Sequence, residues 1–253
     1  MAKITVVGLG PGSLLDMTPR ARQAIEQAEV VAGYNTYIKL IEELLAGRDK
    51  KVLGTAMMQE IDRCRMAVET AASGQETVVV SSGDAGVYGM AGLVLELMLK
   101  LPKEKRPQWG GVVAGVSAVN AAASVLGAPL MHDFAVISLS NLLTPWETIR
   151  KRVQMAAEGD FVTALYNPKS RKRVENIREV QEIMLRCRRP DTPVGIVTAA
   201  SREKQARVIS TLEKFTQEEI NMFSLVLIGN SQTYVQEGWM ITPRGYENKE
   251  IRA

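Results

Sequence analysis

The chain has 253 residues, 46% of them hydrophobic, which is enough for one large α/β domain or two of ordinary size. Its net charge is only +3 despite a sequence pI near 8.8, so the charge balance gives no reason to expect a nucleic-acid or membrane partner. Two cysteines and one histidine are too few for a zinc or iron–sulfur site built by the protein alone, and we expect no protein-bound metal.

Cysteine usage and the amino terminus both indicate a compartment. Cys64 and Cys187 lack the CxxC spacing, and two isolated thiols fit a reducing environment. The chain starts directly with a strand pattern, without the charged and apolar regions of a signal peptide, and it has no apolar run long enough to span a bilayer. We therefore expect a cytoplasmic protein.

In the first half of the chain, short apolar runs typical of strands alternate with helical or polar segments. Strands are predicted at 4–7, 30–32, 77–81, 111–114 and 134–138, and helices at 19–28, 93–99 and 117–126. Thr18 is placed to cap the first helix, with Pro19 in its first turn. The alternation indicates parallel β/α units.

The second half has a different pattern. Thr144-Pro145-Trp146-Glu147 predicts a helix that is capped by Thr144 and runs to about residue 157. Further elements are predicted at 161–166 (strand), 174–185 (helix), 194–198, 205–211 and 224–228 (strands). Because two of these strands follow each other closely, the second sheet is predicted to be partly antiparallel. We place the domain junction between 139 and 145, which gives domains 1–140 and 141–253.

The loop at 81–89 is the most informative segment. It directly follows the strand at 77–81 and holds three glycines, Asp84 and Tyr88. A glycine-spaced loop at the carboxyl end of a strand is where α/β sheets bind ligands, and Asp84 offers an acceptor to hydroxyl or amine donors. The loop has no lysine and fits neither GxxxxGK[ST] nor GxGxxG, which argues against a nucleotide phosphate. The alternative is a tight turn from strand to helix.

The loop after the first strand begins GxG but does not complete a dinucleotide motif. Position 13 is serine where the third glycine belongs, and Pro11 removes a backbone N–H that a pyrophosphate would use. No acidic residue ends the second strand. The Gly-Pro-Gly turn is better interpreted as a rigid wall beside a ligand.

Three other strand ends carry candidate binding residues. Ser117 lies at a helix amino terminus, which favours acceptor atoms, although an ordinary helix cap explains it equally well. Ala199 and Ala200 are small enough to pass close to a planar group. A cationic run follows the strand at 161–166, and it either receives an acidic ligand or forms a solvated surface. Its members are Lys169, Arg171, Lys172 and Arg173.

Taken in order, these loops resemble the class III S-adenosylmethionine-dependent methyltransferases of tetrapyrrole biosynthesis over essentially the whole chain. The shared segments are 8–12, 83–89, 115–118 and 127–130. Within that superfamily, segments 132–134, 138–146, 165–168 and 228–233 resemble the C17-methyltransferases of precorrin-3B and cobalt-precorrin-3. One departure is Asn141, where this group more often has aspartate.

The resemblance implies the tetrapyrrole methylase fold: two α/β domains with the active site in the cleft between them, usually in a homodimer. It implies S-adenosylmethionine-dependent C17-methylation of cobalt-precorrin-3 or precorrin-3B, with ring contraction and lactone formation, in cobalamin biosynthesis. S-adenosylhomocysteine is then the product of the methyl donor. The implied cofactor residues are Pro11, Gly83, Asp84, Val87, Tyr88, Ser117, Ala118, Tyr166, Asn167, Ala199, Ala200 and Thr242.

Lactone formation calls for a general acid or base. His132 is the candidate, because an imidazole exchanges protons near neutral pH, and the alternative is that it only braces the turn at 130–134. The four cations of the 169–173 run are candidates for binding the substrate carboxylates. Two other functions are considered: a methyltransferase acting on a different precorrin intermediate, another tetrapyrrole or diphthamide, and a non-catalytic module that binds one ligand.

Overall fold

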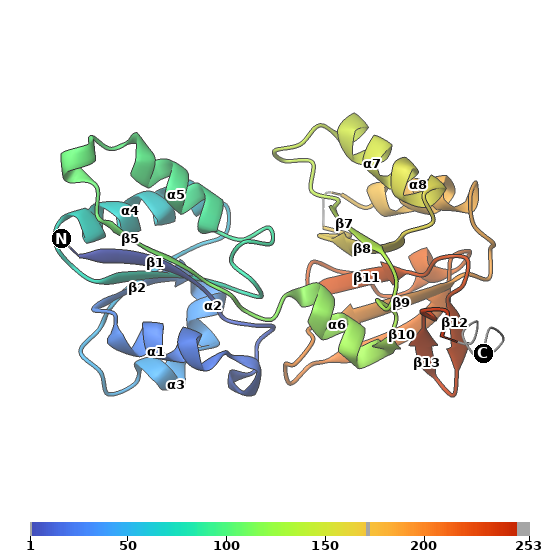
Figure 1. The fold of residues 1–253 in the computed structure, drawn as a ribbon, viewed down its shortest axis with the longest axis horizontal. Helices are drawn as coiled ribbons and strands as arrows, with labels where there is room; N and C mark the ends of the chain where they lie inside the picture. The colour runs from blue at the N-terminus through green and yellow to red at the C-terminus, as the bar shows by residue number, and fades with distance from the viewer. Residues whose placement is uncertain (1, 171–172, 247–253) are drawn as a thin grey trace. The chain divides into compact units, whose positions relative to one another are not determined.

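The structure is a computed structural model that describes residues 2–170 and 173–246 (Figure 1). The chain divides into two compact units, Met1–Ala118 (unit 1) and Val119–Ala253 (unit 2). Among the residues described, no helix has both the length and the apolar composition needed to cross a bilayer.

Unit 1 is a parallel α/β domain. Its strands are β1 (Lys3–Gly8), β2 (Val30–Tyr34), β3 (Lys51–Thr55), β4 (Thr77–Ser81) and β5 (Gln108–Val113). Its helices are α1 (Pro19–Gln27), α2 (Asn35–Lys39), α3 (Glu42–Leu45), α4 (Glu60–Ala72) and α5 (Ala91–Lys100), with short 3₁₀ turns at Leu14–Asp16 and Lys103–Lys105. The strands pair in the order β3-β2-β4-β1-β5, all parallel, so their carboxyl ends share one edge.

Alternating side chains of these strands fill two cores. On β4, Val79 packs with α4 and α5 on one face of the sheet, whereas Val78 and Val80 pack with α1 and α3 on the other (Figure 1). Burial on both faces explains why the central strands are continuous apolar runs. It is also the pattern that made them predictable.

The predicted strands of unit 1 are confirmed, but strand β3 and the helices α2, α3 and α4 were not predicted. Strand β3 lies at the edge of the sheet and exposes Lys51, Val52 and Gly54, so it has no apolar run. Helix α4 follows it and carries charged residues among its buried ones. Thr18 caps α1 as predicted, since its hydroxyl accepts a 3.1 Å hydrogen bond from the Ala21 N–H.

Unit 2 contains a mixed sheet. Its strands are β6 (Gly127–Ala128), β7 (Phe134–Ser138), β8 (Val162–Tyr166), β9 (Pro193–Thr198), β10 (Ala206–Thr211), β11 (Ser224–Ile228), β12 (Tyr234–Gln236) and β13 (Trp239–Ile241). Its helices are α6 (Ala118–Leu126), α7 (Trp146–Glu158) and α8 (Asn176–Leu185), with a 3₁₀ turn at Phe215–Gln217. The main sheet has the order β10-β9-β11-β8-β7, and helices α7 and α8 pack on it through one apolar core.

The direction of β11 decides what lies at each end of this sheet. Strands β7 and β8 are parallel, while β11 runs antiparallel to both β8 and β9, which confirms the predicted mixed sheet. The carboxyl ends of β7, β8 and β9 therefore share one edge. The end of β11 lies at the opposite edge, where the Gly229 N–H bonds to the Pro193 carbonyl.

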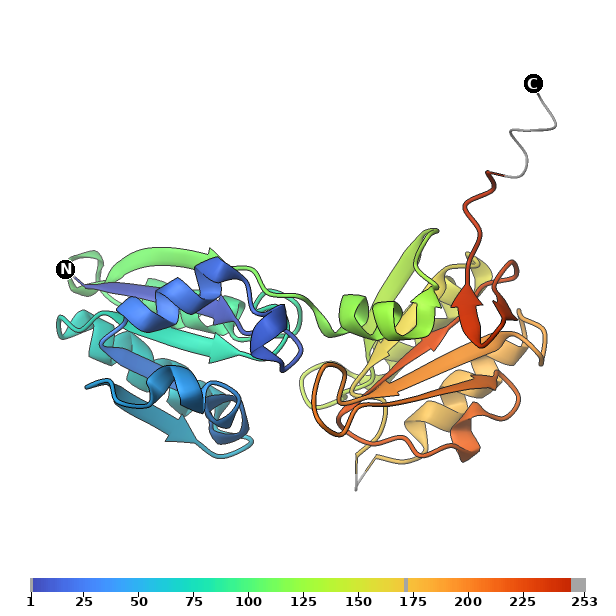
Figure 2. The same cartoon turned by 90° about the horizontal axis from the view of Figure 1, so that it is seen from below.

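The structural division falls at 118/119 rather than at the expected junction near 140. Strand β7, which the sequence groups with the first domain, is paired with β8. Strand β6 pairs with β13, and Figure 2 shows this contact at the end of α6. A Cβ on Gly195 of β9 would meet the Leu126 side chain at 2.4 Å, so α6 also packs tightly on unit 2. The predicted helix at 117–126 spans this boundary, so no break in the sequence pattern marked the division.

The predicted start of α7 is wrong by one residue. Pro145 occupies the capping position instead of Thr144, and no side chain caps the helix. Trp146 is the first helical residue, and its indole N–H donates a 2.6 Å hydrogen bond to Glu179 of α8. This tertiary contact fixes the start of the helix in place of the predicted cap.

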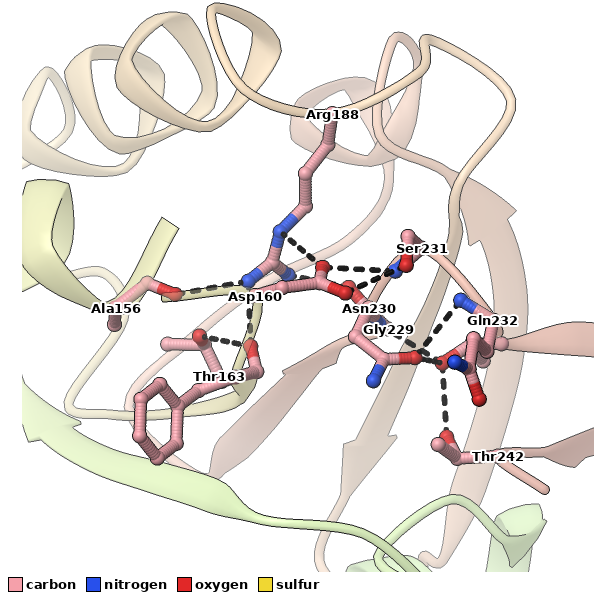
Figure 3. Close-up of polar contacts among 11 residues, drawn as sticks. Ala156, Asp160, Thr163, Arg188, Gly229, Asn230, Ser231, Gln232 and Thr242 are labelled. Carbon is pink, nitrogen blue, oxygen red and sulfur yellow. Dashed lines mark hydrogen bonds and ion pairs between the residues drawn. The ribbon is translucent and has the colours of Figure 1, made fainter. Parts of the chain in front are cut away.

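Arg188 joins several segments of unit 2 (Figure 3). Its side chain is 1% exposed, and its guanidinium donates to the carbonyls of Gly229, Ala156 (3.2 Å) and Phe161 (2.5 Å). The Asp160 carboxylate lies 4.0 Å from its Nε and accepts hydrogen bonds from the Ser231 N–H (2.9 Å) and hydroxyl (2.5 Å). Desolvation by burial lowers the pKa of Arg188, partly offset by Asp160.

Replacing Arg188 by Ala should lower the free energy of unfolding by about 3 kcal/mol or more, because it leaves buried carbonyls without donors and opens a cavity. Urea unfolding measures the effect. The matched control is Arg186→Ala, since Arg186 is exposed two residues earlier and should change stability by less than about 0.5 kcal/mol. Equal stability of the two variants would contradict a central role for the Arg188 network.

Candidate functional site

Three loops of unit 1 meet backbone to backbone at the carboxyl edge of its sheet. They follow β1, β4 and β5, and we call residues 8–12, 82–90 and 114–118 the unit 1 edge. Gly10 and Gly83 exchange two backbone hydrogen bonds of 3.1 and 2.7 Å. A Cβ on Gly115 would lie 2.3 Å from the Gly83 oxygen, and one on Gly8 would lie 2.7 Å from the same oxygen. The glycines are required because the loops touch where side chains would stand.

Asp84 organises this junction. One carboxylate oxygen accepts a 2.8 Å hydrogen bond from the Gly86 N–H, and the other accepts a 3.0 Å bond from the Gly115 N–H. The sequence suggests Asp84 as an acceptor for a ligand. In the structure its carboxylate serves the loops themselves, which ties the loop after β4 to the loop after β5.

The other predicted cofactor residues of unit 1 lie on the same edge. Pro11 is buried beside the Gly10–Gly83 pair, and Ser117 is buried before α6, whose first residue is Ala118. Val87 and Tyr88 are 37% and 54% exposed on the loop after β4. The structure therefore brings together all seven residues predicted for unit 1.

Unit 2 has a comparable edge at the carboxyl ends of β7, β8 and β9, formed by residues 138–141, 166–169 and 198–201 (the unit 2 edge). The Tyr166 hydroxyl accepts a 3.0 Å hydrogen bond from the Val119 N–H, one of the amides that the first turn of α6 leaves without a helical partner. This bond connects the end of β8 to the start of α6.

Asn167 is fixed at both ends. The side-chain amide of Asn167 donates a 3.0 Å hydrogen bond to the Ser138 hydroxyl. The backbone carbonyl of Asn167 accepts a 2.8 Å hydrogen bond from the Arg173 guanidinium. Arg173 is half-buried, and desolvation lowers its pKa. We predicted Arg173 as a substrate ligand, but here it holds the turn after β8. Ser138 was not selected from the sequence, although it lies in the 138–146 segment of the resemblance.

Three predicted cofactor residues have a positive φ, a backbone conformation that residues other than glycine rarely adopt. Tyr88, Asn167 and Ala199 have φ values of +54°, +51° and +50°. Each such residue costs on the order of 1–2 kcal/mol, and backbone strain of this kind concentrates at functional sites. Ala200 follows Ala199 in the same turn. Met58, Asp160 and Glu237, which lie outside the two edges, also have positive φ, so this conformation agrees with ligand binding at the edges but is shared with other turns.

Thr242 is not brought to the unit 2 edge. It is fully buried, its N–H donates to the Ala128 carbonyl at 3.1 Å, and its hydroxyl lies 2.8 Å from that of Thr233. Thr233 already donates to Asn230, so Thr242 is the donor in this pair. Asn230 and Thr233 follow β11, so they lie at the opposite edge of the sheet.

His132 also lies at that opposite edge, two residues before the start of β7. Strand β7 itself spans roughly 13 Å from Phe134 to Ser138, and His132 precedes it by two residues. Its Nδ1 accepts a 2.9 Å hydrogen bond from the Asp133 N–H, and the Asp133 carboxylate lies 3.9 Å from the same atom. This geometry favours the alternative in which His132 stabilises its own turn.

Of the remaining predicted cations, Lys169 is partly exposed at the unit 2 edge. Arg171 and Lys172 lie outside the described residues. Within 2–170 and 173–246, no group of three or more histidine, cysteine, aspartate or glutamate residues is arranged to hold a metal ion.

The chain belongs to the tetrapyrrole (corrin/porphyrin) methylase family, whose sequence model matches residues 3–216. The predicted family and fold class are thereby confirmed, and the chain is a methyltransferase. It is 48% identical to a Salmonella typhimurium protein named probable cobalt-factor III C(17)-methyltransferase, over 96% of this chain and 99% of that protein. It is also similar to the crystal structure of the methyltransferase CobJ, with a TM-score of 0.89, 36% identity, and coverage of 96% of this chain and 100% of that one.

A longer relative is equally similar. The cobalt-factor III methyltransferase of Priestia megaterium is 47% identical over 98% of this chain, but the match covers only 46% of that protein. The chain thus spans about half of the Priestia protein and nearly all of the Salmonella protein.

Gly115→Ala should lower the free energy of unfolding by about 1–3 kcal/mol, because its Cβ would clash with backbone that cannot turn away. The control is Gly92→Ala in α5, where no atom lies within 4 Å of the new Cβ and the change should be neutral or stabilising by up to about 1 kcal/mol. Denaturant unfolding compares the two. A Gly115 variant as stable as the Gly92 variant would show that the loops can move apart freely.

His132→Ala should leave the methyl-transfer kcat unchanged within error, since the imidazole is bonded to its own turn at the opposite edge. A general acid–base role predicts a loss of about 100-fold or more. Single-turnover assays of methyl transfer and of lactone formation measure both steps. A loss of that size in either step, in a variant that unfolds like wild type, would restore the catalytic interpretation.

Proposed function

We propose that this protein is an S-adenosylmethionine-dependent C17-methyltransferase of cobalamin biosynthesis that acts on cobalt-precorrin-3 or precorrin-3B, with ring contraction and lactone formation. The observation that carries the proposal is 48% identity over nearly the full length of a protein bearing the C(17)-methyltransferase name. A C-methyltransferase acting on a different precorrin intermediate is the second candidate.

The unit 1 edge supports S-adenosylmethionine as the methyl donor. Its loops bring backbone close together and carry no lysine on a glycine-rich turn, which suits a sulfonium compound without phosphates. Val87 and Tyr88 present exposed apolar surface beside the glycine junction. At the unit 2 edge, Tyr166, Asn167, Ala199 and Ala200 are the residues that we assign to the same donor.

When bound, S-adenosylmethionine supplies a methyl group that is already electrophilic. The donor would supply this methyl group and leave as S-adenosylhomocysteine, and the residues of the two edges would hold it. The contribution of this chain is therefore orientation and exclusion of water, effects worth roughly 7–11 kcal/mol in favourable cases. The hydrogen bonds of Asp84, Ser138 and Arg173 hold the loops in one conformation and so serve that orientation.

The proposal also includes a homodimer, a cytoplasmic location, and the absence of nucleic-acid and membrane partners. The family resemblance supports the first, and cysteine usage with low net charge supports the others. Lys169, Arg171 and Lys172 stay candidates for binding the substrate carboxylates.

Purified protein should convert cobalt-precorrin-3 or precorrin-3B, in the presence of S-adenosylmethionine, into a product that carries one added methyl group. Mass spectrometry of reactions with each substrate identifies the preferred one, and reactions with other precorrins test the second candidate. Calorimetric titration with S-adenosylhomocysteine is run alongside. If the protein binds S-adenosylhomocysteine but forms no product from any tetrapyrrole, it is a binding module and not an enzyme. If it does not bind S-adenosylhomocysteine, the assigned methyl donor is wrong.

A further inference from the structure

Arg63 is a buried cation on the carboxyl side of unit 1. It lies in the first turn of α4 and is only 3% exposed. Its Nη1 donates a 2.5 Å hydrogen bond to the hydroxyl of Thr55, the last residue of β3. Its Nη2 lies 3.7 Å from the sulfur of Met90. Met90 is at the end of the loop that carries Val87 and Tyr88. The guanidinium therefore adjoins the unit 1 edge.

The partners of Arg63 are too few and too weak for a buried charge. A guanidinium has five N–H donors, and a thioether is a weak acceptor. Nε is buried without a hydrogen-bond partner. Among the described residues, no carboxylate forms an ion pair with Arg63. Buried charges in proteins are normally paired, so this one lacks its expected partner.

Arg188 shows how the same chain treats a buried arginine that has a structural role. Three backbone carbonyls accept from the Arg188 guanidinium, and Asp160 lies beside it. Among the described residues, no backbone carbonyl accepts from Arg63, and its two acceptors are a hydroxyl and a sulfur. The Nε of each arginine lacks a hydrogen-bond partner, but only Arg188 has carbonyl acceptors and a neighbouring carboxylate within its unit.

The neighbouring thiol does not supply the missing negative charge. The Cys64 Sγ lies 3.9 Å from the Met90 sulfur, in the same cluster as Arg63. Burial raises the Cys64 pKa to about 11, with the positive charge of Arg63 acting in the opposite direction. The thiol is therefore neutral at physiological pH. Met90 itself is unbranched and flexible, so it can move aside for a ligand.

We propose that Arg63 binds a carboxylate on the periphery of the tetrapyrrole substrate. The ends of β3 and β4 are two strand spacings apart, roughly 10 Å, so a macrocycle held beside the loop after β4 can extend an acidic side chain to Arg63. A charge-assisted bond to the carboxylate satisfies the donors that the protein leaves unmet. The inference rests on the proposed function, because it takes the tetrapyrrole as the ligand.

The test compares Arg63→Met, which keeps the length of the side chain without its charge, with Arg63→Lys, which keeps the charge. Arg65→Met is the matched control: Arg65 lies two residues along α4, is exposed, and pairs only with Asp62. Spectroscopic titration with cobalt-factor III, without a methyl donor, gives the substrate Kd. Titration with S-adenosylhomocysteine and urea unfolding are measured on every variant.

Arg63→Met should raise the Kd for cobalt-factor III by about 10- to 100-fold, and Arg63→Lys by less, with S-adenosylhomocysteine binding kept within about twofold. Arg65→Met should match wild type. The salt dependence of tetrapyrrole binding should also weaken in Arg63→Met. If that variant does not fold, Arg63→Gln takes its place, and a Kd for cobalt-factor III unchanged from wild type in Arg63→Gln contradicts the proposal.

Each failure has its own signature. Wild-type protein that binds no tetrapyrrole contradicts the proposed function. Wild type that binds cobalt-factor III, with a folded Arg63→Met that binds it equally well, contradicts only the role of Arg63. Equal losses of tetrapyrrole and S-adenosylhomocysteine binding would show that Arg63 supports the loop at 82–90 instead of contacting substrate.

Discussion

The close backbone approach at the unit 1 edge is the constraint on which the candidate site depends. Gly8, Gly83 and Gly115 lie at three neighbouring strands: a Cβ on Gly8 or Gly115 would clash with the Gly83 carbonyl oxygen, and Gly83 itself has a φ of +69°. Once these loops are in contact, Asp84 has two amides within reach and Tyr88 is held with positive φ. The parallel sheet brings the loops together, and the glycines allow them to touch. The site is thus a property of sheet packing first and of side-chain chemistry second.

Unit 2 reaches a comparable result by other means. Its edge is held by side chains instead of by glycine contacts: Asn167 bonds to Ser138, Arg173 bonds to Asn167, and Tyr166 bonds to the start of α6. These bonds stabilise a strained turn whose conformation costs free energy. A cationic side chain that the sequence suggests as a ligand contact can instead stabilise the protein's own turn, because a backbone carbonyl in a tight turn also needs a hydrogen-bond donor.

The sequence predicted most strands and helices, because buried parallel strands are continuous apolar runs and helices carry cap residues and periodic apolar faces. It missed β3, whose exposed side chains give no such run, and α4 with it. The resemblance located the loops of both edges, but it also grouped Thr242 with them and suggested His132 as a catalyst. Thr242 bonds to Thr233 after β11, so its position depends on which way β11 runs, and strand direction leaves no mark on local residue patterns. His132 precedes β7, so it lies at the end of that strand away from Ser138. The partners of Asp84, Arg63 and Arg173 are equally invisible before the chain is folded.

The antiparallel course of β11 has a consequence for how variation in this chain is read. It places the 229–233 segment, a signature of the resemblance, on the side of the sheet away from the strained turns, where Gly229 and Ser231 serve the Arg188 network. A motif can therefore be diagnostic of a subgroup because it closes the scaffold. Substitutions in the 229–233 segment should therefore lower expression and thermal stability. Substitutions that change the methyl-acceptor substrate should lie in the loops at the other end of the sheet.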